Sequence, residues 1–315
     1  MICKLGIVFP GQGAQYVGMG KDFYREFDEA RSTFAEAREI LNCDIAELCF
    51  QGPAEVLDQT VNTQIAVLTV DVAAYKVFEK EVGIQPAVMA GHSLGEYGAL
   101  HAAGAISFAD VLPLVYTRAT YQQEAVPVGT GSMAAIMGLD EDTLTHICST
   151  IGKTTGRIID IVNFNAPSQQ VISGHTEAVT QAIAEAKENG ARGIMLPISV
   201  PCHCRLLDDA AKKFKENLTG ITVNDFNIDV LPNYNPKITY SKDNIRNLLA
   251  KQLNSPVKWQ ETIEKMVEMG INTIIEIGPK RTLSGLIKRI NGTVKTLNIE
   301  DTASLDKTLK IIKGL

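Results

Sequence analysis

Short apolar runs alternate along the chain with longer segments in which apolar residues recur at helical spacing. The candidate strands are 5–10, 86–91 and 273–278, and the candidate helices are 26–41, 63–83, 92–105, a polar stretch up to about 218, and 282–290. Segment 63–83 is apolar on most faces, which predicts a buried helix, and Gly83 is a typical helix end. Strands alternating with helices predict a parallel sheet covered on both faces.

The pattern changes from about residue 130, where strands become more frequent. Strands are predicted at 133–138, 158–165, 169–174 and 193–199, and helices at 140–151 and 176–190. The resulting β-α-β-β-α-β order is typical of a ferredoxin-like unit. We therefore predict a small ferredoxin-like domain at 128–198, inserted into a large α/β domain formed by 1–127 and 199–315.

The bulk composition narrows the class of protein. The chain has 315 residues, of which 45% are hydrophobic and 21% charged, as in an ordinary globular enzyme. The net charge of −6 argues against nucleic acid as the main partner, because such binding depends on Lys and Arg. No apolar run reaches the roughly 20 residues of a membrane helix, and the start lacks a signal-peptide pattern. Six scattered cysteines in apolar surroundings indicate reduced thiols, so we expect a cytoplasmic protein.

The strongest chemical motif is GHSLGEY at 91–97, which contains G-x-S-x-G. Ser93 lies between a predicted strand and a predicted helix, flanked by Gly91 and Gly95. In this arrangement the serine occupies a strained turn and its hydroxyl points into a cleft. The start of the following helix also offers backbone N–H groups to a developing oxyanion. Ser93 is therefore the candidate nucleophile.

A serine nucleophile requires a base, and the chain offers His92, His101, His146, His175 and His203. His203, in VPCHC (200–204), lies where the chain returns to the large domain, and it follows the serine as in hydrolase-like folds. Sequence position alone makes His203 only the best of the five. Cys202 or Cys204 could instead serve as a thiol nucleophile, but strand neighbours point to opposite faces. We expect no metal, because no second ligand pair has zinc-site spacing.

Several motifs together resemble one known family. They are FPGQGAQ (9–15), GHSLGEY (91–97), RATYQQEAVPVGTGSMAAIMG (118–138), NFNAPSQQVISG (163–174), VPCHC (200–204), QLNSPVKW (252–259) and EIGPKRTLSGL (276–286). In this order, from about residue 5 to about 300, they resemble the malonyl-CoA:acyl carrier protein transacylase family. The resemblance implies an α/β-hydrolase-like large domain beside the ferredoxin-like one.

The resemblance also implies residue roles. Ser93 would be the nucleophile and His203 the general base and then acid, with the backbone carbonyl of Gln252 orienting the imidazole. The backbone N–H groups of Gln12 and Leu94 would form the oxyanion hole. By itself, the FPGQGAQ segment is only a weak nucleotide-binding signal, since it lacks the glycine and lysine positions of phosphate loops.

Substrate selection is assigned by the same resemblance. Arg118 would bind the free carboxylate of a malonyl group, because a guanidinium binds a carboxylate in bidentate geometry. Asn163 would border the substrate. Leu94 favours malonyl over methylmalonyl, whereas Cys202 stands where many relatives are expected to have serine. The expected chemistry is a ping-pong transfer through acyl-serine, with the coenzyme A thioester as substrate and no further cofactor.

The expected partners are malonyl-CoA and an acyl carrier protein, with no nucleic acid and no membrane. Carrier proteins are acidic, so a local basic patch could dock one despite the net charge. That patch would consist of Lys280, Arg281, Lys288 and Arg289. We expect a monomer.

Three alternatives remain open from the sequence. A thioesterase or esterase on the same scaffold would pair His203 with an acid such as Asp140 or Asp160. A non-catalytic binding protein of the same fold would not need Ser93, His203 and Arg118 together. A methylmalonyl-specific or trans-acting polyketide acyltransferase would share the site, so the pathway, fatty acid or polyketide, stays undecided.

Overall fold

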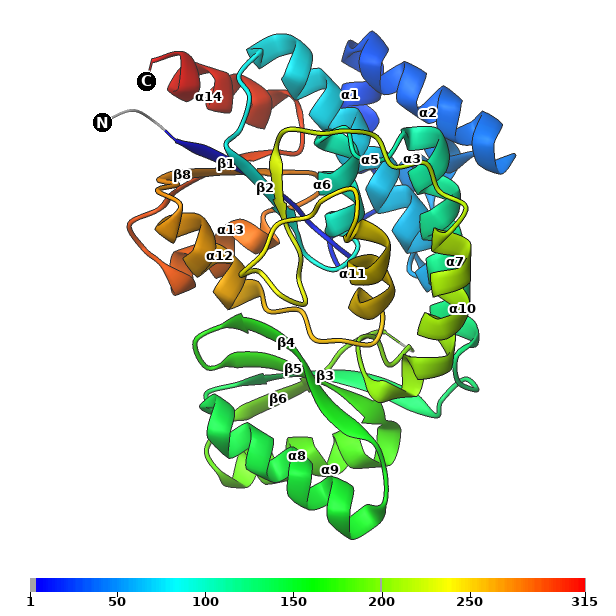
Figure 1. The fold of residues 1–315 in the computed structure, drawn as a ribbon, viewed down its shortest axis with the longest axis vertical. Helices are drawn as coiled ribbons and strands as arrows, with labels where there is room; N and C mark the ends of the chain where they lie inside the picture. The colour runs from blue at the N-terminus through cyan, green and yellow to red at the C-terminus, as the bar shows by residue number, and fades with distance from the viewer. Residues whose placement is uncertain (1–3, 199, 315) are drawn as a thin grey trace.

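The computed structural model describes residues 4–198 and 200–314, which form a large and a small α/β layer system (Figure 1). The large sheet has the order β7-β2-β1-β8-β9, and every neighbouring pair is parallel. Its strands are β1 (Leu5–Phe9), β2 (Val88–Gly91), β7 (Asp229–Leu231), β8 (Thr273–Ile277) and β9 (Lys295–Ile299). The parallel sheet confirms the predicted α/β class.

The helices of the large unit cover both faces of this sheet. They are α1 (Lys21–Glu26), α2 (Asp28–Leu41), α3 (Ile45–Gln51), α4 (Ala54–Leu57), α5 (Thr60–Val82), α6 (Gly95–Ala102), α7 (Phe108–Glu124), α10 (Asp208–Leu218), α11 (Ile245–Gln252), α12 (Trp259–Glu268), α13 (Thr282–Ile290) and α14 (Thr302–Lys313). Side chains alternate along β1, so Ile7 and Phe9 join the core beneath α5 and α6. Val8 joins the opposite core beneath α12 and α13.

Some predicted elements differ from the observed ones. The predicted helix 26–41 is interrupted at Phe27, whose extended backbone separates α1 from α2. The predicted strand 193–199 is paired only over β6 (Arg192–Met195), and Ser199 lies outside the described residues. The polar helix after the VPCHC segment begins with a short 3₁₀ turn, Arg205–Leu207, before α10.

The small unit is ferredoxin-like, as predicted. Its elements are β3 (Gly131–Met137), α8 (Glu141–Thr155), β4 (Ile159–Ala166), β5 (Gln169–His175), α9 (Thr176–Glu188) and β6. The strand order is β4-β5-β3-β6, and all neighbours are antiparallel. Helices α8 and α9 cover the face of this sheet that is turned away from the large sheet (Figure 1).

Strand β4 joins the two units. The backbone N–H of Val257, just before α12, donates to the carbonyl of Val162 at 2.8 Å. The N–H of Phe164 donates back to the carbonyl of Val257 at 2.9 Å. Main-chain hydrogen bonds of this kind hold the small sheet in a defined position against the large unit.

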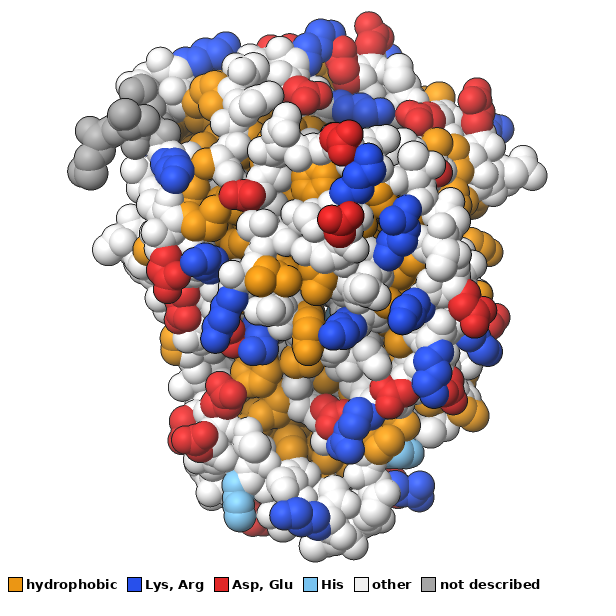
Figure 2. All heavy atoms as spheres, in the orientation of Figure 1, with side chains coloured by type: hydrophobic (Ala, Val, Ile, Leu, Met, Phe, Trp, Pro, Cys, Tyr) orange, Lys and Arg blue, Asp and Glu red, His pale blue; other side chains and the backbone are white. Residues whose placement is uncertain are grey.

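The surface carries both signs of charge. On the face shown in Figure 2, acidic and basic side chains are interspersed and no single sign dominates. Within the described ranges, no helix combines the length and apolar character needed to cross a bilayer.

Candidate active site

The corner between β2 and α6 positions Ser93. Its φ of 53° is left-handed, as expected for a serine at a sharp strand-to-helix turn. The flanking glycines allow close packing: a Cβ on Gly91 would lie 1.9 Å from the carbonyl carbon of Gly95. A Cβ on Gly95 would lie 2.1 Å from the carbonyl oxygen of Phe9. Any larger residue at either position would push α6 away from the sheet and move Ser93.

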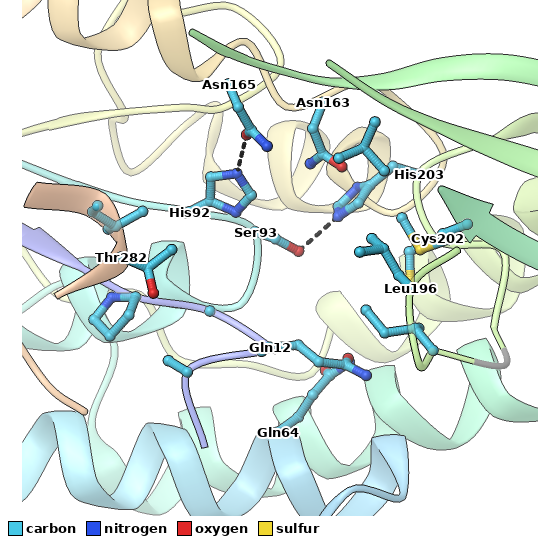
Figure 3. Close-up of a pocket in the computed structure, with 18 of the residues that line it drawn as sticks. Gln12, Gln64, His92, Ser93, Asn163, Asn165, Leu196, Cys202, His203 and Thr282 are labelled. Carbon is cyan, nitrogen blue, oxygen red and sulfur yellow. Dashed lines mark hydrogen bonds between the residues drawn. The ribbon is translucent and has the colours of Figure 1, made fainter. Parts of the chain in front are cut away.

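Ser93 and His203 are brought together by the fold. The Ser93 Oγ lies 2.6 Å from His203 Nε2 (Figure 3). On the other side of the ring, His203 Nδ1 lies 2.8 Å from the backbone carbonyl oxygen of Gln252. A carbonyl oxygen only accepts, so Nδ1 carries the proton and donates to it. The other ring nitrogen, Nε2, is then left to accept the proton of the Ser93 hydroxyl. Gln252 thus takes the position that a carboxylate has in a full triad.

Burial keeps the imidazole of His203 neutral. The side chain is 3% exposed, and desolvation lowers its pKa to about 3, with the nearby charge of Arg118 acting in the same direction. The hydrogen bond to Gln252 opposes this shift only in part. At neutral pH the ring is therefore in the form that can accept a proton.

The other histidines have different partners. His92 Nε2 lies 2.8 Å from Oδ1 of Asn165, a residue of β4, and so points across to the small unit (Figure 3). His101 and His175 bond to backbone groups near them, and His146 is exposed on α8. The structure therefore places His203, of the five, beside the serine hydroxyl.

Arg118 lies at the floor of the same site and is only 1% exposed. Its Nη2 donates to Ser93 Oγ at 3.1 Å and to Gln252 Oε1 at 3.0 Å, while Nη1 donates to Gln64 Oε1 at 2.7 Å. The guanidinium also lies over the ring of Tyr97, 5.4 Å from its centroid. All of these hydrogen-bond acceptors are neutral, so the guanidinium can still pair directly with an incoming anion.

The backbone N–H groups of Gln12 and Leu94 lie near this centre. Among the described residues neither has a hydrogen-bond acceptor, and the segments that carry them are in contact. A Cβ on Gly11 would lie 2.3 Å from the carbonyl oxygen of His92 and 3.6 Å from the nitrogen of Leu94. The oxyanion hole assigned to Gln12 and Leu94 remains a prediction with free donors on both segments.

A cavity of about 200 Å³ contains these groups and opens between the two units. The large unit contributes Gln12, Ser93, Arg118, Cys202, His203, Thr282 and Leu286, and the small unit contributes Met133, Asn163, Asn165, Val171, Leu196 and Ile198. Asn163 is 5% exposed in its wall. The small-unit wall is mainly apolar, which favours exclusion of water from the serine.

The alternative nucleophiles beside His203 are in apolar surroundings. Cys202 and Cys204 belong to a buried cluster with Met133, Val162 and Val171, among others. Burial raises the pKa of Cys202 to about 11 and that of Cys204 to about 12, so both remain thiols at neutral pH. No group of three or more His, Cys, Asp or Glu side chains suited to a metal occurs in residues 4–198 and 200–314.

The two candidate acid partners have other roles. Asp140 caps α8 by accepting the backbone N–H of Thr143 at 2.8 Å. Asp160 forms an ion pair with Arg205, with Nη2 and Oδ1 2.8 Å apart. Neither is hydrogen-bonded to His203, whose Nδ1 is directed at a backbone carbonyl instead.

Several residues of the site were not expected from the sequence. Gln64 holds Arg118 from α5, and its only signal is a polar side chain in a helix that is buried over most of its length. Asn233 follows β7, accepts the N–H of Ser93 at 2.6 Å and donates to the carbonyl of Gly91 at 2.6 Å. No sequence pattern indicated Asn233, because its contact with Ser93 depends on the order of strands in the sheet.

The four basic docking candidates are not equivalent. Lys280 Nζ donates to the carbonyl of Gly13 at 3.0 Å, and Arg289 bonds to the side chain of Gln169 on β5. Arg281 and Lys288 line a separate outer groove of about 510 Å³ between α13, β9 and α14. Lys307 lines the same groove.

A serine on a strand-to-helix corner, beside a neutral histidine, defines a serine-nucleophile type of α/β enzyme site. The chain matches the acyl transferase domain family over residues 7–308. It is 44% identical over 309 residues to the malonyl CoA-acyl carrier protein transacylase of Escherichia coli (strain K12), with 98% of this chain and 99% of that protein covered.

Solved structures agree with this relationship. The malonyl CoA-acyl carrier protein transacylase from Clostridium perfringens ATCC 13124 is 42% identical, with a TM-score of 0.93 and coverage of 99% of this chain and 98% of that one. The malonyl-transacylase PlMCAT, solved in complex with the type II PKS acyl-carrier protein AntF, is 43% identical, with a TM-score of 0.95 and coverage of 98% and 99%. The chain belongs to the malonyl-CoA:acyl carrier protein transacylase family and is an acyltransferase.

Proposed function

We propose that this enzyme transfers a malonyl group from malonyl-CoA to the phosphopantetheine thiol of an acyl carrier protein. One observation carries the proposal: Ser93 Oγ lies 2.6 Å from His203 Nε2 and 3.1 Å from Nη2 of the buried Arg118. A nucleophile, a base and a cation thus meet in one cavity. That combination suits an acyl group with a free carboxylate at its far end.

In the proposed first half-reaction, His203 Nε2 takes the proton of Ser93 as Oγ attacks the thioester carbonyl. The negative charge on the carbonyl oxygen is stabilised by the free N–H groups of Gln12 and Leu94. Collapse of this intermediate breaks the carbon–sulfur bond, and His203 returns the proton to the departing coenzyme A thiol. The product is a malonyl ester of Ser93.

The second half-reaction runs in the opposite sense with a new thiol. His203 removes the proton of the phosphopantetheine thiol, which attacks the ester carbonyl of acylated Ser93. The serine oxygen leaves and takes the proton back from His203. No cofactor beyond the two substrates is needed for this sequence of steps.

Arg118 is the proposed determinant of malonyl selection. Its Nη2 is adjacent to Ser93 Oγ, so an acyl group on that oxygen would place its free carboxylate near the guanidinium. Acetyl has no carboxylate and would leave the buried guanidinium without an anion in direct contact. Methylmalonyl has the carboxylate but needs room for a methyl group beside the apolar wall that contains Cys202 and Leu196.

A thioesterase is the competing activity on this scaffold. Two observations favour transfer: His203 is oriented by the backbone carbonyl of Gln252 instead of a carboxylate, and a cation is built in beside the serine. The relatives are named as transacylases, and one was solved with a type II PKS acyl-carrier protein. We therefore propose supply of extender units for fatty acid or polyketide synthesis by a monomer in the cytoplasm, where thiols such as those described stay reduced.

Intact-protein mass spectrometry after mixing with malonyl-CoA, methylmalonyl-CoA or acetyl-CoA tests the proposal. The wild type should gain one malonyl group, and Ser93→Ala should gain none. Arg118→Ala and Arg118→Lys should lose malonyl loading by about a hundredfold or more while acetyl loading changes little, because a buried charge pair is lost. Circular dichroism spectra would show that each variant is folded.

Two results would contradict the proposal. Steady release of free malonate without a carrier thiol as the main activity would make the enzyme a hydrolase. Absence of any adduct in a folded wild type, with no hydrolysis, would indicate a binding protein.

Carrier docking at the outer groove is the finer part of the proposal. Arg281 and Lys288 are directed into that groove, whereas Lys280 and Arg289 are engaged within the chain. The double variant Arg281→Glu, Lys288→Glu should raise the KM for the carrier about tenfold and leave acylation by malonyl-CoA unchanged. Lys153→Glu, an exposed charge reversal on α8, is the matched control. An unchanged KM in the double variant would exclude this groove.

A further inference from the structure

A buried polar network lies beneath the Ser93 corner, and Glu96 is at its centre. Glu96 is the second residue of α6 and is 0% exposed. One carboxylate oxygen, Oε1, accepts hydrogen bonds from the hydroxyl of Tyr240 and from the backbone N–H of Asn233, the latter at 3.3 Å. The other oxygen, Oε2, accepts from Gln252 Nε2 at 3.0 Å. All three partners donate, so the network is built for the ionised carboxylate.

The side-chain amide of Gln252 connects Glu96 with Arg118. Its Oε1 accepts from Arg118 Nη2 at 3.0 Å, and its Nε2 donates both to Glu96 Oε2 and to the carbonyl of Ser93 at 2.6 Å. An arginine can only donate and a carboxylate can only accept, so the amide has one orientation that satisfies both. Arg118 and Glu96 are therefore a buried pair of opposite charges linked by a single amide.

Gln252 consequently links the groups around the serine hydroxyl. Its backbone carbonyl accepts from His203, while its side chain bonds to the Ser93 backbone, to Arg118 and to Glu96. If Glu96 lost its charge, the donor from Gln252 would face a protonated carboxyl. That carboxyl accepts a weaker hydrogen bond than the carboxylate. The amide would then be oriented mainly by the Ser93 carbonyl, and the oxygen that it presents to Arg118 would be held less firmly.

The charge state of Glu96 is balanced between opposing effects. Burial raises its pKa to about 7, although the hydrogen bonds from Tyr240, Gln252 and Asn233 and the charge of Arg118 all lower it. The titratable and charged groups around it are Tyr240, Tyr97 of α6 and Arg118 of α7. Both tyrosines have raised pKa values and remain neutral, so Glu96 and Arg118 are the charges that matter here.

We propose that Glu96 is a positioning residue, which holds Arg118 through the Gln252 amide in the orientation that binds the free carboxylate of the acyl group. The inference rests on the proposed function of Arg118. It predicts that selectivity for a carboxylated acyl group depends on the charge of Glu96, a residue that touches neither substrate nor nucleophile side chain. Loss of that charge should lower kcat/KM for malonyl-CoA and leave kcat/KM for acyl groups without a carboxylate unchanged.

The test measures kcat/KM for malonyl-CoA and for acetyl-CoA at each pH from about 5.5 to 8.5, and uses their ratio. Titration of His203, of Ser93 or of the carrier thiol affects both substrates alike and cancels in the ratio. The carboxylate of malonyl-CoA stays ionised throughout this range. In the wild type the ratio should be highest above a midpoint near pH 7 and fall below it, as Glu96 is protonated.

Three variants sharpen the test. Glu96→Gln should lower the ratio about tenfold at high pH, as for loss of one buried hydrogen bond to a charged group, and make it independent of pH. Glu96→Asp should restore part of the pH dependence. Tyr240→Phe removes a donor to the carboxylate, so the midpoint should move to higher pH. Asp71→Asn, which neutralises a buried carboxyl outside this network, is the control and should leave the ratio and its midpoint unchanged.

The outcomes separate this inference from the function on which it rests. A wild-type ratio that is flat with pH, or one that rises as Glu96 is protonated, overturns the positioning role even if Arg118→Ala abolishes malonyl selection. Failure of Arg118→Ala to change selection overturns the proposed function itself. If Glu96→Gln does not fold, the wild-type profile and the midpoint of Tyr240→Phe still decide.

Discussion

At the scale of single residues, Ser93 and His203 share an unusual backbone conformation. Their φ angles are 53° and 63°, in the left-handed region that non-glycine residues seldom adopt. Such strain persists where the surroundings hold it in place. Asn233 bonds to the backbone N–H of Ser93 and to the carbonyl of Gly91, and the Gln252 carbonyl holds the imidazole. The site is therefore preorganised before any substrate arrives.

The lowered pKa of His203 gives a test of this preorganisation. The neutral imidazole is the proposed base, and it predominates at pH values well above its pKa of about 3. Labelling of Ser93 by phenylmethylsulfonyl fluoride, which does not need Arg118 to bind a carboxylate, should therefore keep its rate within about twofold from about pH 5.5 to 8. The rate would be followed by intact mass, with His203→Ala as the unreactive control.

An ordinary imidazole would behave differently. If its pKa were the ordinary 6.5, roughly nine-tenths of the imidazole would be protonated one pH unit below that value, and labelling would slow about tenfold. A drop of that size between pH 7 and about 5.5 would show that burial does not keep His203 neutral.

At the scale of elements, the corner between β2 and α6 determines where Ser93, the proposed nucleophile, lies. The first turn of α6 packs directly against the end of β1, where a side chain on Gly95 would meet the carbonyl oxygens of Phe9 and Pro10 at 2.1 and 2.6 Å. One turn later the helix has moved away from the strand. A Cβ on Gly98 would be 3.4 Å from the Phe9 ring, an ordinary contact.

The two glycines of α6 should therefore respond differently to the same substitution. Gly95→Ala forces backbone apart and should lower the free energy of unfolding by at least about 2 kcal/mol, with loss of acylation. Gly98→Ala adds helix propensity and should leave stability unchanged or raise it by up to about 1 kcal/mol. Urea denaturation followed by circular dichroism measures both. Equal losses in the two variants would rule out close packing of the first turn as the cause.

At the scale of the whole molecule, the catalytic cavity depends on the fixed placement of the small unit. Main-chain bonds between β4 and Val257, together with the bond from His92 to Asn165, connect the two units beside the cavity. Arg289 of α13 adds a bond to Gln169 on the neighbouring strand. These bonds fix the apolar wall against the large unit, and such a wall would help exclude water from an acylated serine.

A second buried carboxyl affects the stability of the large unit. Asp71 in α5 is 0% exposed, and neither of its oxygens has a hydrogen-bond partner among the described residues. It lies against Gly278, where a Cβ would be 2.1 Å from its Oδ1. Burial raises the pKa of Asp71 well above the ordinary value, and the negative charge of Glu276 adds a smaller effect in the same direction. Folding therefore favours the protonated form of Asp71.

This gives a stability prediction with a definite sign. A carboxyl with a raised folded pKa stabilises the fold fully below its unfolded pKa, and this contribution is lost as pH rises through the folded pKa. Asp71→Asn should thus have a higher Tm than the wild type at pH 8, with a difference that shrinks toward about pH 4. The corresponding difference in the free energy of unfolding should change by roughly 1.4 kcal/mol per pH unit in the window where only the folded state keeps the proton. Differential scanning fluorimetry at several pH values measures both Tm values. A Tm difference independent of pH would contradict the assignment.

Much of the fold could be predicted because it depends on local patterns. The central strands at 5–10, 86–91 and 273–278 are continuous apolar runs, as burial on both faces requires. The ferredoxin-like order followed from the spacing of strands and helices. The edge strands β7 and β9 were not predicted, because one has three residues and the other is only partly buried.

The sequence by itself determined the residues whose geometry is local and those carried by family resemblance. The corner at Ser93 follows from glycines at fixed spacing, and the resemblance directed attention to His203, Arg118 and the Gln252 carbonyl. Tertiary structure alone decided the rest. Gln64 reaches the site from α5, Asn233 from the loop after β7, and Glu96 from the buried face of α6. No local sequence pattern encodes the distances between them. The pKa values likewise depend on burial, a property of the assembled core and not of any single segment.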